Sequence, residues 1–348
     1  MKKQILNFTL LAIIALIFGA CKNDHATTTP PPVSAEKTII GSTGIPDIDK
    51  LSLKIAQDPK NAELYAARAE KFYQNEGYDN AIQDMASAMK IDSTNADYHH
   101  LLADIYLDYY KSRLALQTMK RCVALYPKRM ASLFKLAEIQ QILKQYDASM
   151  ATVVRVMKID PDNPRGFFMI GVNHALKGNK KMAIKNLQKC VDIDPEYTEA
   201  WVLLGQIFEQ DNDPLALQYF ENAVETAPDN VEVLYSKASY LHNHDQLDKA
   251  EEVLKKIIKI NRQYPSAFDR LGVIYLEKDS IDKAYENFNI AVNIAPDFGV
   301  AYYHRGYASE LKGDLKAAKR DYQNILNFNP DSKEAKEGMK RVAELLKK

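Results

Sequence analysis

The sequence predicts an all-α solenoid, a fold in which pairs of antiparallel helices stack one after another along a single axis. Three observations predict it. Prolines recur at a spacing of 34 residues, small residues recur at two fixed positions of each unit, and the large apolar residues between them lie three and four residues apart, as on one helical face. One interval, from Pro195 to Pro228, is 33 residues, which indicates a deletion in the turn around residues 211–213. The other recurring prolines are Pro59, Pro127, Pro161, Pro296 and Pro330, with Ser93 and Arg262 in the two vacant positions.

The first 20 residues have the pattern of an export signal. Lys2 and Lys3 precede an uninterrupted apolar run over residues 10–18, which is too short to span a bilayer because a spanning helix needs about 20 apolar residues. Residues 18–21, Phe-Gly-Ala-Cys, resemble the lipobox of bacterial lipoproteins. We therefore expect residues 1–20 to be a signal peptide and Cys21 to be lipidated; a plain thiol at Cys21 is the alternative.

Residues 21–46 contain a Thr-Thr-Thr-Pro-Pro-Pro run and few large apolar side chains. Such a segment buries too little surface to offset the entropy of ordering, so we expect a disordered tether behind the lipidated Cys21. Lys22 follows Cys21 directly, and the lipoprotein resemblance then implies the outer membrane. Whether the protein faces the periplasm or the cell surface stays open.

Eight units follow the tether and a short helical segment. The eighth position of every unit is Ala or Gly, and the position that opens the contact face of the second helix is Ala or Ser. Small side chains are needed there because packed helix axes approach within about 8–10 Å. The expected units are residues 62–95, 96–129, 130–163, 164–197, 198–230, 231–264, 265–298 and 299–332.

This pattern resembles the tetratricopeptide-repeat family, which implies a right-handed superhelix of helix-turn-helix repeats. Residues 47–61 and 333–348 are expected to form capping helices at the two ends, because the ends of a repeat array need polar outer faces. Three repeats depart from the family pattern. Arg68, Lys237 and Arg305 stand where Leu is usual, so the sequence leaves open how repeats 1, 6 and 8 pack at these positions.

The sequence offers no catalytic machinery. It has no glycine-rich phosphate loop, nucleophile elbow or paired-histidine zinc motif, so we predict no enzyme, no cofactor and no metal site. His242 and His244 are expected to be structural, since zinc needs three or four converging ligands. Cys122 and Cys190 occupy the same position two repeats apart, so they are predicted to be buried free thiols. The chain has 46 basic and 46 acidic residues, so its formal net charge is zero. Because binding to nucleic acid depends largely on excess positive charge, we expect no nucleic-acid partner.

The family resemblance places a partner-binding groove at the second, fifth, ninth and twelfth positions of each first helix. Aromatic anchors there, beside acidic residues in the first three repeats, suit an extended or helical peptide that carries basic residues. The alternative for each residue is that the aromatic ring packs and the acid is merely solvated. The candidate groove residues are Tyr73, Asp97, Asp104, Phe134, Glu138, Phe168, Tyr235, Tyr303 and Tyr307.

These features predict a non-catalytic scaffold or adaptor anchored to the bacterial cell envelope. Its partners would be envelope proteins, and its membrane contact would be the lipid anchor. Two alternatives remain open. Glycan or nutrient capture is disfavoured by the short connections between repeats, and end-to-end self-assembly is disfavoured by the charged final helix.

Overall fold

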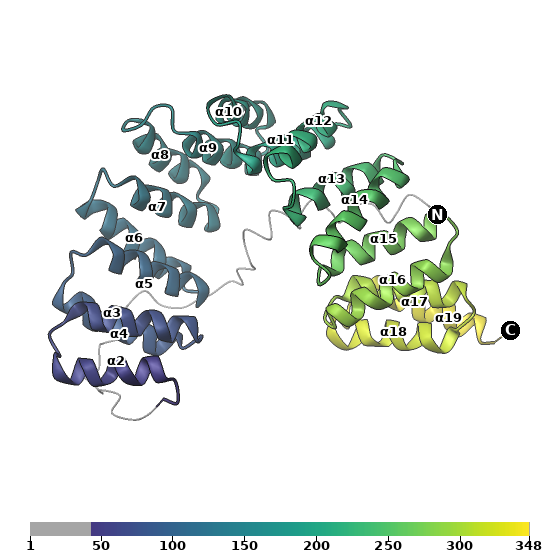
Figure 1. Cartoon of the computed structure of the whole chain (residues 1–348), viewed down its shortest axis with the longest axis horizontal. Coiled ribbons are helices and arrows are strands. Elements are labelled where there is room, and N and C mark those ends of the chain that lie inside the picture. The colour runs from purple at the N-terminus through teal and green to yellow at the C-terminus, as the bar shows by residue number, and fades with distance from the viewer. Residues whose placement is uncertain (1–42, 348) are drawn as a thin grey trace. The chain divides into compact units, whose positions relative to one another are not determined.

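The computed structural model of the protein describes residues 43–347. The predicted signal peptide, Cys21 and most of the predicted tether lie outside the described residues. Within them the chain forms eighteen α-helices and no strand, which confirms the predicted all-α class (Figure 1). No helix between residues 43 and 347 is both long and apolar enough to cross a membrane. The helices fall into two compact units, the first ending at Ile193 and the second beginning at Asp194.

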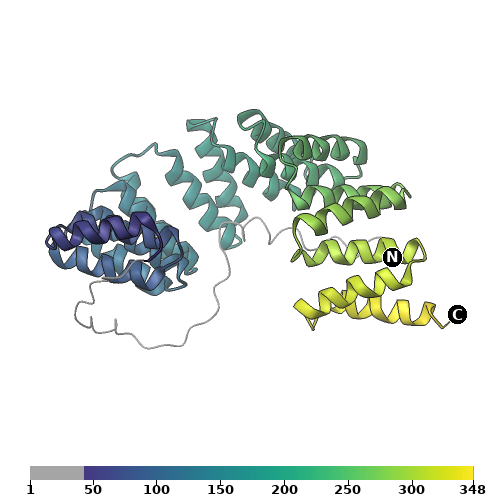
Figure 2. The ribbon, with the colours of Figure 1, turned by 60° about the horizontal axis from the view of Figure 1, so that its bottom comes forward.

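The first unit contains an N-terminal helix and four helical pairs, and each helix packs against the next in chain order (Figure 2). The first helices of the pairs begin at Ala62, Ala96, Met130 and Pro164. The helices are α2 (Pro46–Gln57), α3 (Ala62–Gln74), α4 (Tyr78–Ile91), α5 (Ala96–Asp108), α6 (Ser112–Leu125), α7 (Met130–Ile142), α8 (Tyr146–Met157), α9 (Pro164–Leu176) and α10 (Lys180–Ile193).

The second unit repeats this arrangement with four helical pairs and a C-terminal helix. Its first helices begin at Thr198, Val231, Pro265 and Gly299. The helices are α11 (Thr198–Glu209), α12 (Leu215–Thr226), α13 (Val231–Asn243), α14 (Leu247–Ile260), α15 (Pro265–Glu277), α16 (Ile281–Ile294), α17 (Gly299–Leu311), α18 (Leu315–Phe328) and α19 (Lys333–Leu345).

The two helices of a pair approach closely at the small residues that recur in the sequence. A Cβ atom added to Gly272 of α15 would lie 2.5 Å from the ring of Phe288 on α16. A Cβ atom added to Gly205 of α11 would meet Phe220 of α12 at 2.8 Å. No real contact is so short, so the ring on the second helix occupies the space that a side chain on the first helix would need. The small residues are therefore required by packing.

The turn inside each pair contains one residue in the left-handed backbone region. Gly178 and Gly313 take this role, as their placement in the sequence suggests. Gly77 does not, because the left-handed residue of that turn is Glu76, with φ of 58°. The remaining turns use Tyr110, Lys144, Asn212, Asp245 and Asp279. The deleted residue of the fifth repeat lies just after Asn212, where Pro214 precedes α12 directly.

Repeats 1 and 8 accommodate their arginines through ion pairs between the two helices. Arg68 of α3 is 3% exposed and donates from Nε and Nη2 to the two carboxylate oxygens of Asp84 on α4, both at 2.7 Å. Its Nη1 donates to Ser52 Oγ of α2 at 2.9 Å. Burial raises the pKa of Asp84, and the Arg68 guanidinium opposes that rise. A bidentate ion pair thus replaces an apolar contact between the two helices.

Repeat 8 uses the same solution. Arg305 of α17 donates to both oxygens of Asp321 on α18, at 2.8 and 2.7 Å, and its Nη1 donates to Asn289 Oδ1 at 2.8 Å. In repeat 6, Lys237 forms a longer ion pair of 3.4 Å with Glu221. Glu221 lies on α12 of the preceding repeat, whereas Asp84 and Asp321 lie in the same repeat as their arginines.

Candidate interaction surface on the first helices

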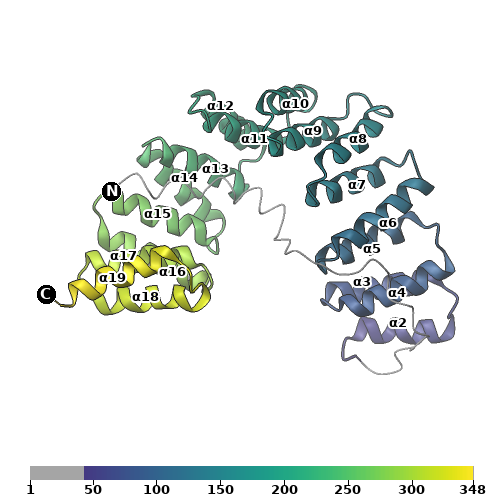
Figure 3. The same cartoon turned by 180° about the vertical axis from the view of Figure 1, so that it is seen from behind.

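The candidate site is the surface formed by the first helices of successive repeats, here called the first-helix face. Within the first unit α3 contacts α5 and α5 contacts α7, and within the second unit α11 contacts α13 and α15 contacts α17. Figure 3 shows α13, α15 and α17 of the second unit from behind. Because the repeats share one geometry, side chains at equivalent positions of neighbouring first helices come within reach of one another.

The three acidic candidates of the first unit each form an ion pair with a cation of the protein. Arg129 donates from Nη2 to Asp97 at 2.6 Å. Asp104 forms an ion pair with Lys135, and Glu138 forms one with Arg165. In each pair the cation comes 27 to 32 residues later in the chain, on the next first helix or, for Arg129, at its N-cap. These carboxylates are therefore neutralised within the protein.

The aromatic candidates of the first unit differ in how much surface they offer. Phe134 is only 5% exposed and belongs to the core, with the Arg165 guanidinium 4.5 Å from its ring centre. Phe168 is half-buried against the same core. Tyr73 is half-buried, and its hydroxyl donates to Asp108. Burial, with the Asp108 carboxylate adding to it, raises the pKa of Tyr73. Tyr73 and Phe168 are thus available to a partner in part, and Phe134 is not.

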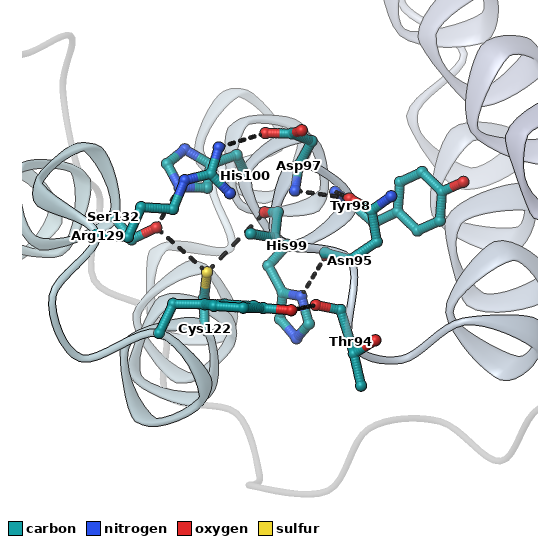
Figure 4. A network of polar contacts seen from close by, with 11 residues as sticks. Thr94, Asn95, Asp97, Tyr98, His99, His100, Cys122, Arg129 and Ser132 are labelled. Carbon is teal, nitrogen blue, oxygen red and sulfur yellow. Dashed lines mark hydrogen bonds and ion pairs between the residues drawn. The ribbon is translucent and has the colours of Figure 1, made fainter.

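A polar network joins repeats 2 and 3 beneath this surface (Figure 4). His100 Nε2 lies 2.8 Å from Ser132 Oγ, and the Cys122 thiol lies 3.4 Å from the same hydroxyl. Burial lowers the pKa of His100, and the positive charge of Arg129 lowers it further. Asn95 caps α5 by accepting from the Asp97 amide at 2.9 Å. The network fixes the start of α5 against α7.

The second unit presents a different set of groups around Tyr235. Arg270 Nε donates to the Tyr235 hydroxyl at 3.1 Å, and its guanidinium lies 5.2 Å from the ring centre. The other side of Arg270 lies 3.1 Å from His242 Nδ1, and His242 Nε2 lies 3.1 Å from Glu277. One chain of contacts therefore links α13 and α15 and fixes the orientation of the tyrosine ring.

Tyr303 and Tyr307 lie on α17 beside Arg341 of α19. The Arg341 guanidinium is 5.9 Å from the Tyr307 ring centre and donates from Nη2 to Glu310 at 3.0 Å. Tyr303 packs at a tilt against Tyr322, with 5.9 Å between ring centres, and burial raises its pKa. The two tyrosines are half-buried, so each keeps an exposed edge.

Sequence reasoning missed the sixth position of the first helices. Lys135, Arg270 and His304 occupy it, and each contacts a residue of the preceding first helix. For His304 the partner is Asp269, 2.8 Å away. The sequence does contain a pattern that could have predicted these contacts. In each contact the two complementary groups are 31 to 35 residues apart, which is close to the length of one repeat.

Residues 43–347 form no cluster of side chains that could bind a metal ion. Among residues 43–347, no three His, Cys, Asp or Glu side chains come together as ligands for a metal ion. Cys122 and Cys190 are both fully buried and neither forms a disulfide, as predicted. What the surface offers is an array of rings and ion pairs, which suits recognition of a partner.

The tetratricopeptide-repeat profile matches four segments of the chain: residues 131–163, 164–197, 215–271 and 300–332. Three of these segments each contain one helical pair, such as α7 with α8. The chain belongs to the tetratricopeptide-repeat family.

Two curated proteins are similar to this chain over part of their length. The chain is 27% identical over 267 residues to the rat mitochondrial import receptor subunit TOM70, a match that covers 74% of this chain and 38% of TOM70. It is 21% identical over 200 residues to the DnaJ homolog subfamily C member 7 homolog of Dictyostelium discoideum, covering 58% of this chain and 34% of that protein. The chain thus spans little more than a third of these relatives.

Solved structures share the fold at lower identity. The Cut9–Hcn1 assembly of the APC/C aligns with a TM-score of 0.54 at 14% identity, covering 85% of this chain and 58% of that one. PilW, a type IV pilus biogenesis factor, aligns with a TM-score of 0.52 at 19% identity, covering 59% of this chain and 95% of PilW. Both similarities show a solenoid of tetratricopeptide repeats.

Proposed function

We propose that this protein is a non-catalytic scaffold of the bacterial cell envelope that binds protein partners on its first-helix face. The family consists of interaction modules, and TOM70, the relative described above, is named as a receptor subunit. The export signal and the lipobox-like residues before Cys21 support the envelope location and the lipid anchor.

The observation that carries the proposal is the set of half-buried tyrosines on the second unit. Tyr235, Tyr303 and Tyr307 are held by arginine, histidine and ring contacts, so little side-chain entropy is lost when a partner covers them. Tyrosine and arginine are the residues most enriched where alanine substitution costs the most binding energy.

The internal ion pairs change the expected character of the partner. Because Asp97, Asp104 and Glu138 are already neutralised, a strongly basic peptide gains little from them. The partner segment that fits best presents apolar or aromatic side chains to the tyrosines and polar groups to the arginines between them.

The test is co-purification from detergent-solubilised envelopes with the parent protein and a Tyr235→Ala/Tyr303→Ala variant. Loss of at least one specific partner is expected, while circular dichroism shows unchanged helicity. The matched control is Phe328→Ala, which removes an aromatic ring that is 67% exposed at the end of a second helix. An identical partner set for parent and variant would refute binding on the first-helix face.

The envelope location has a separate test. Mass spectrometry of the N-terminal peptide should show cleavage before Cys21 and a diacylglyceryl mass on its sulfur, and Cys21→Ser should remove both. The control is Cys122→Ser, which changes a buried thiol and should leave the modification intact. An unmodified Cys21 in protein purified from envelopes would refute the proposal that this protein is a lipoprotein.

A further inference from the structure

The second helices of the first unit carry cations in a regular row. Arg121 on α6, Arg155 on α8 and Lys189 on α10 occupy the same position of three successive repeats, 34 residues apart. Each repeat adds two helices packed at about 8–10 Å, so the row advances in steps on the order of 10–20 Å. Arg121 and Lys189 are exposed, and Arg155 is half-buried with its Nη2 donating to the Pro127 carbonyl at 3.3 Å.

On α10 two further lysines extend the row of cations along the helix. Lys181, Lys185 and Lys189 follow one another at four-residue spacing and are all exposed. Like charges at this spacing repel one another and destabilise a helix. Asp192 is the only acidic residue of α10, three residues after Lys189, and none of the three lysines has a carboxylate within ion-pair distance among the described residues. An anion from outside the unit would remove this repulsion.

Apolar side chains are exposed among these cations. Leu125 at the end of α6, Val154 on α8, Ile159 just after α8 and Met182 on α10 are 42, 45, 42 and 36% exposed. Cations interleaved with exposed aliphatic groups characterise protein surfaces that sit in the interfacial layer of a bilayer, where both kinds of group find favourable contacts.

Two lysines on α14 of the second unit are paired instead. On α14, Lys255 pairs with Glu251 at 2.6 Å and Lys256 with Asp229 at 3.6 Å. The formal charges also separate along the chain: residues 43–193 contain 22 basic and 17 acidic residues, a net of +5, and residues 194–348 contain 20 basic and 27 acidic residues, a net of −7. The three unpaired lysines of α10 therefore belong to the unit that is positive as a whole.

We propose that the basic face of α6, α8 and α10, defined by Arg121, Arg155, Lys181, Lys185 and Lys189, docks on an anionic lipid surface. The ligands are the headgroup phosphates of that surface. The cations are spread over three helices and do not converge on one pocket, and the aliphatic groups between them add apolar contact with the interface. This docking is distinct from partner binding on the first-helix face and does not require an acyl chain on Cys21.

The test is flotation of the full chain carrying Cys21→Ser with vesicles of phosphatidylcholine, with and without phosphatidylglycerol. The added anionic lipid should increase binding, and the increase should fall with salt as the charges are screened. A Lys181→Glu/Lys185→Glu/Lys189→Glu variant should lose about 100-fold in affinity for the anionic vesicles, since each basic residue near such a surface contributes about fivefold. Residues 1–20 are the same in all variants, so any vesicle binding by that segment contributes equally to each of them.

The matched control is Lys249→Glu/Lys255→Glu/Lys259→Glu, which makes the same charge change on α14 of the second unit and should bind like the parent. A Lys→Gln version of the α10 variant should lose less than the Glu version while keeping native helicity. Equal vesicle binding by the parent and a folded α10 variant would overturn the proposal, as would binding of an acidic protein or nucleic acid at α10 without any vesicle binding. Partner capture through Tyr235 and Tyr303 should be unchanged in the α10 variant, so the two proposals fail independently.

Discussion

Repeats 1 and 8 hold their two helices together differently from repeat 7. In repeat 7, Leu271 of α15 is 4% exposed and packs in the apolar core. In repeats 1 and 8 the equivalent residues are Arg68 and Arg305, and each is matched by an aspartate sixteen residues later, Asp84 or Asp321. The comparison shows that a charged residue at this family position should be interpreted together with the residue sixteen positions later, which contacts it.

The largest expected effect comes from breaking the pair in repeat 1. Asp84→Ala leaves the Arg68 guanidinium 3% exposed without its carboxylate, which should lower the free energy of unfolding by about 3–5 kcal/mol. Chemical denaturation followed by circular dichroism measures it. Arg68→Leu with Asp84→Val imitates an apolar repeat and should recover most of the loss; a double variant as unstable as Asp84→Ala would contradict the comparison.

The apolar repeat can be disturbed at its closest contact. Gly272→Ala places a methyl group 2.5 Å from the Phe288 ring and should cost about 1–3 kcal/mol of unfolding free energy. In repeat 8, Gly306→Ala meets the Tyr322 ring at 3.0 Å and should cost less. Thermal melts of both variants would test this order, and a larger loss for Gly306→Ala would show that repeat 8 is the tighter of the two.

Glu251 of repeat 6 is also in ion pairs, but it is less deeply buried than Asp84 or Asp321. Hydrogen bonds from Lys255 and then Lys278 lower the pKa of Glu251 from 4.5 to about 2. Because the folded pKa is depressed, the stabilisation is complete above about pH 4.5 and is lost as the pH falls toward 2. Denaturation at several pH values should show Glu251→Gln less stable than the parent by about 1–3 kcal/mol at pH 7, with the difference shrinking in acid. A difference that does not change with pH would argue against an ionised Glu251 as the cause.

The smallest effect concerns the turns. Tyr110 has φ of 58°, a region in which a bulky side chain is strained, whereas Gly178 and Gly313 fill the equivalent turns freely. Tyr110→Gly should therefore raise the unfolding free energy by about 0.5–1 kcal/mol, and Gly178→Ala should lower it by a similar amount. The two changes in melting temperature should have opposite signs, and a shared sign would exclude backbone strain as the reason.

Most of the fold could be predicted because it depends on periodic features of the sequence. Small residues such as Gly272 and apolar residues such as Leu271 recur at fixed positions, and their spacing alone indicates two packed helices. The left-handed turn residues were harder to predict, since Glu76 and Tyr110 carry no glycine to mark the position.

The candidate surface was less predictable because position alone does not tell whether a side chain is free. Phe134 stands at a groove position of the family but is enclosed by the core and by Arg165. Asp104 and Glu138 were read as exposed acids, and their partners, Lys135 and Arg165, lie a repeat away. Such pairing becomes visible only when neighbouring repeats are compared residue by residue.

The ion pairs between successive first helices also determine how this array can change. Asp104 requires the lysine of the following repeat, and Asp269 faces the histidine of the repeat after it. A repeat that was duplicated, removed or exchanged would bring the wrong neighbour to these positions and leave charges without partners. The repeats share one shape, but each of these is fitted to its own neighbour, so their order is part of what the sequence encodes.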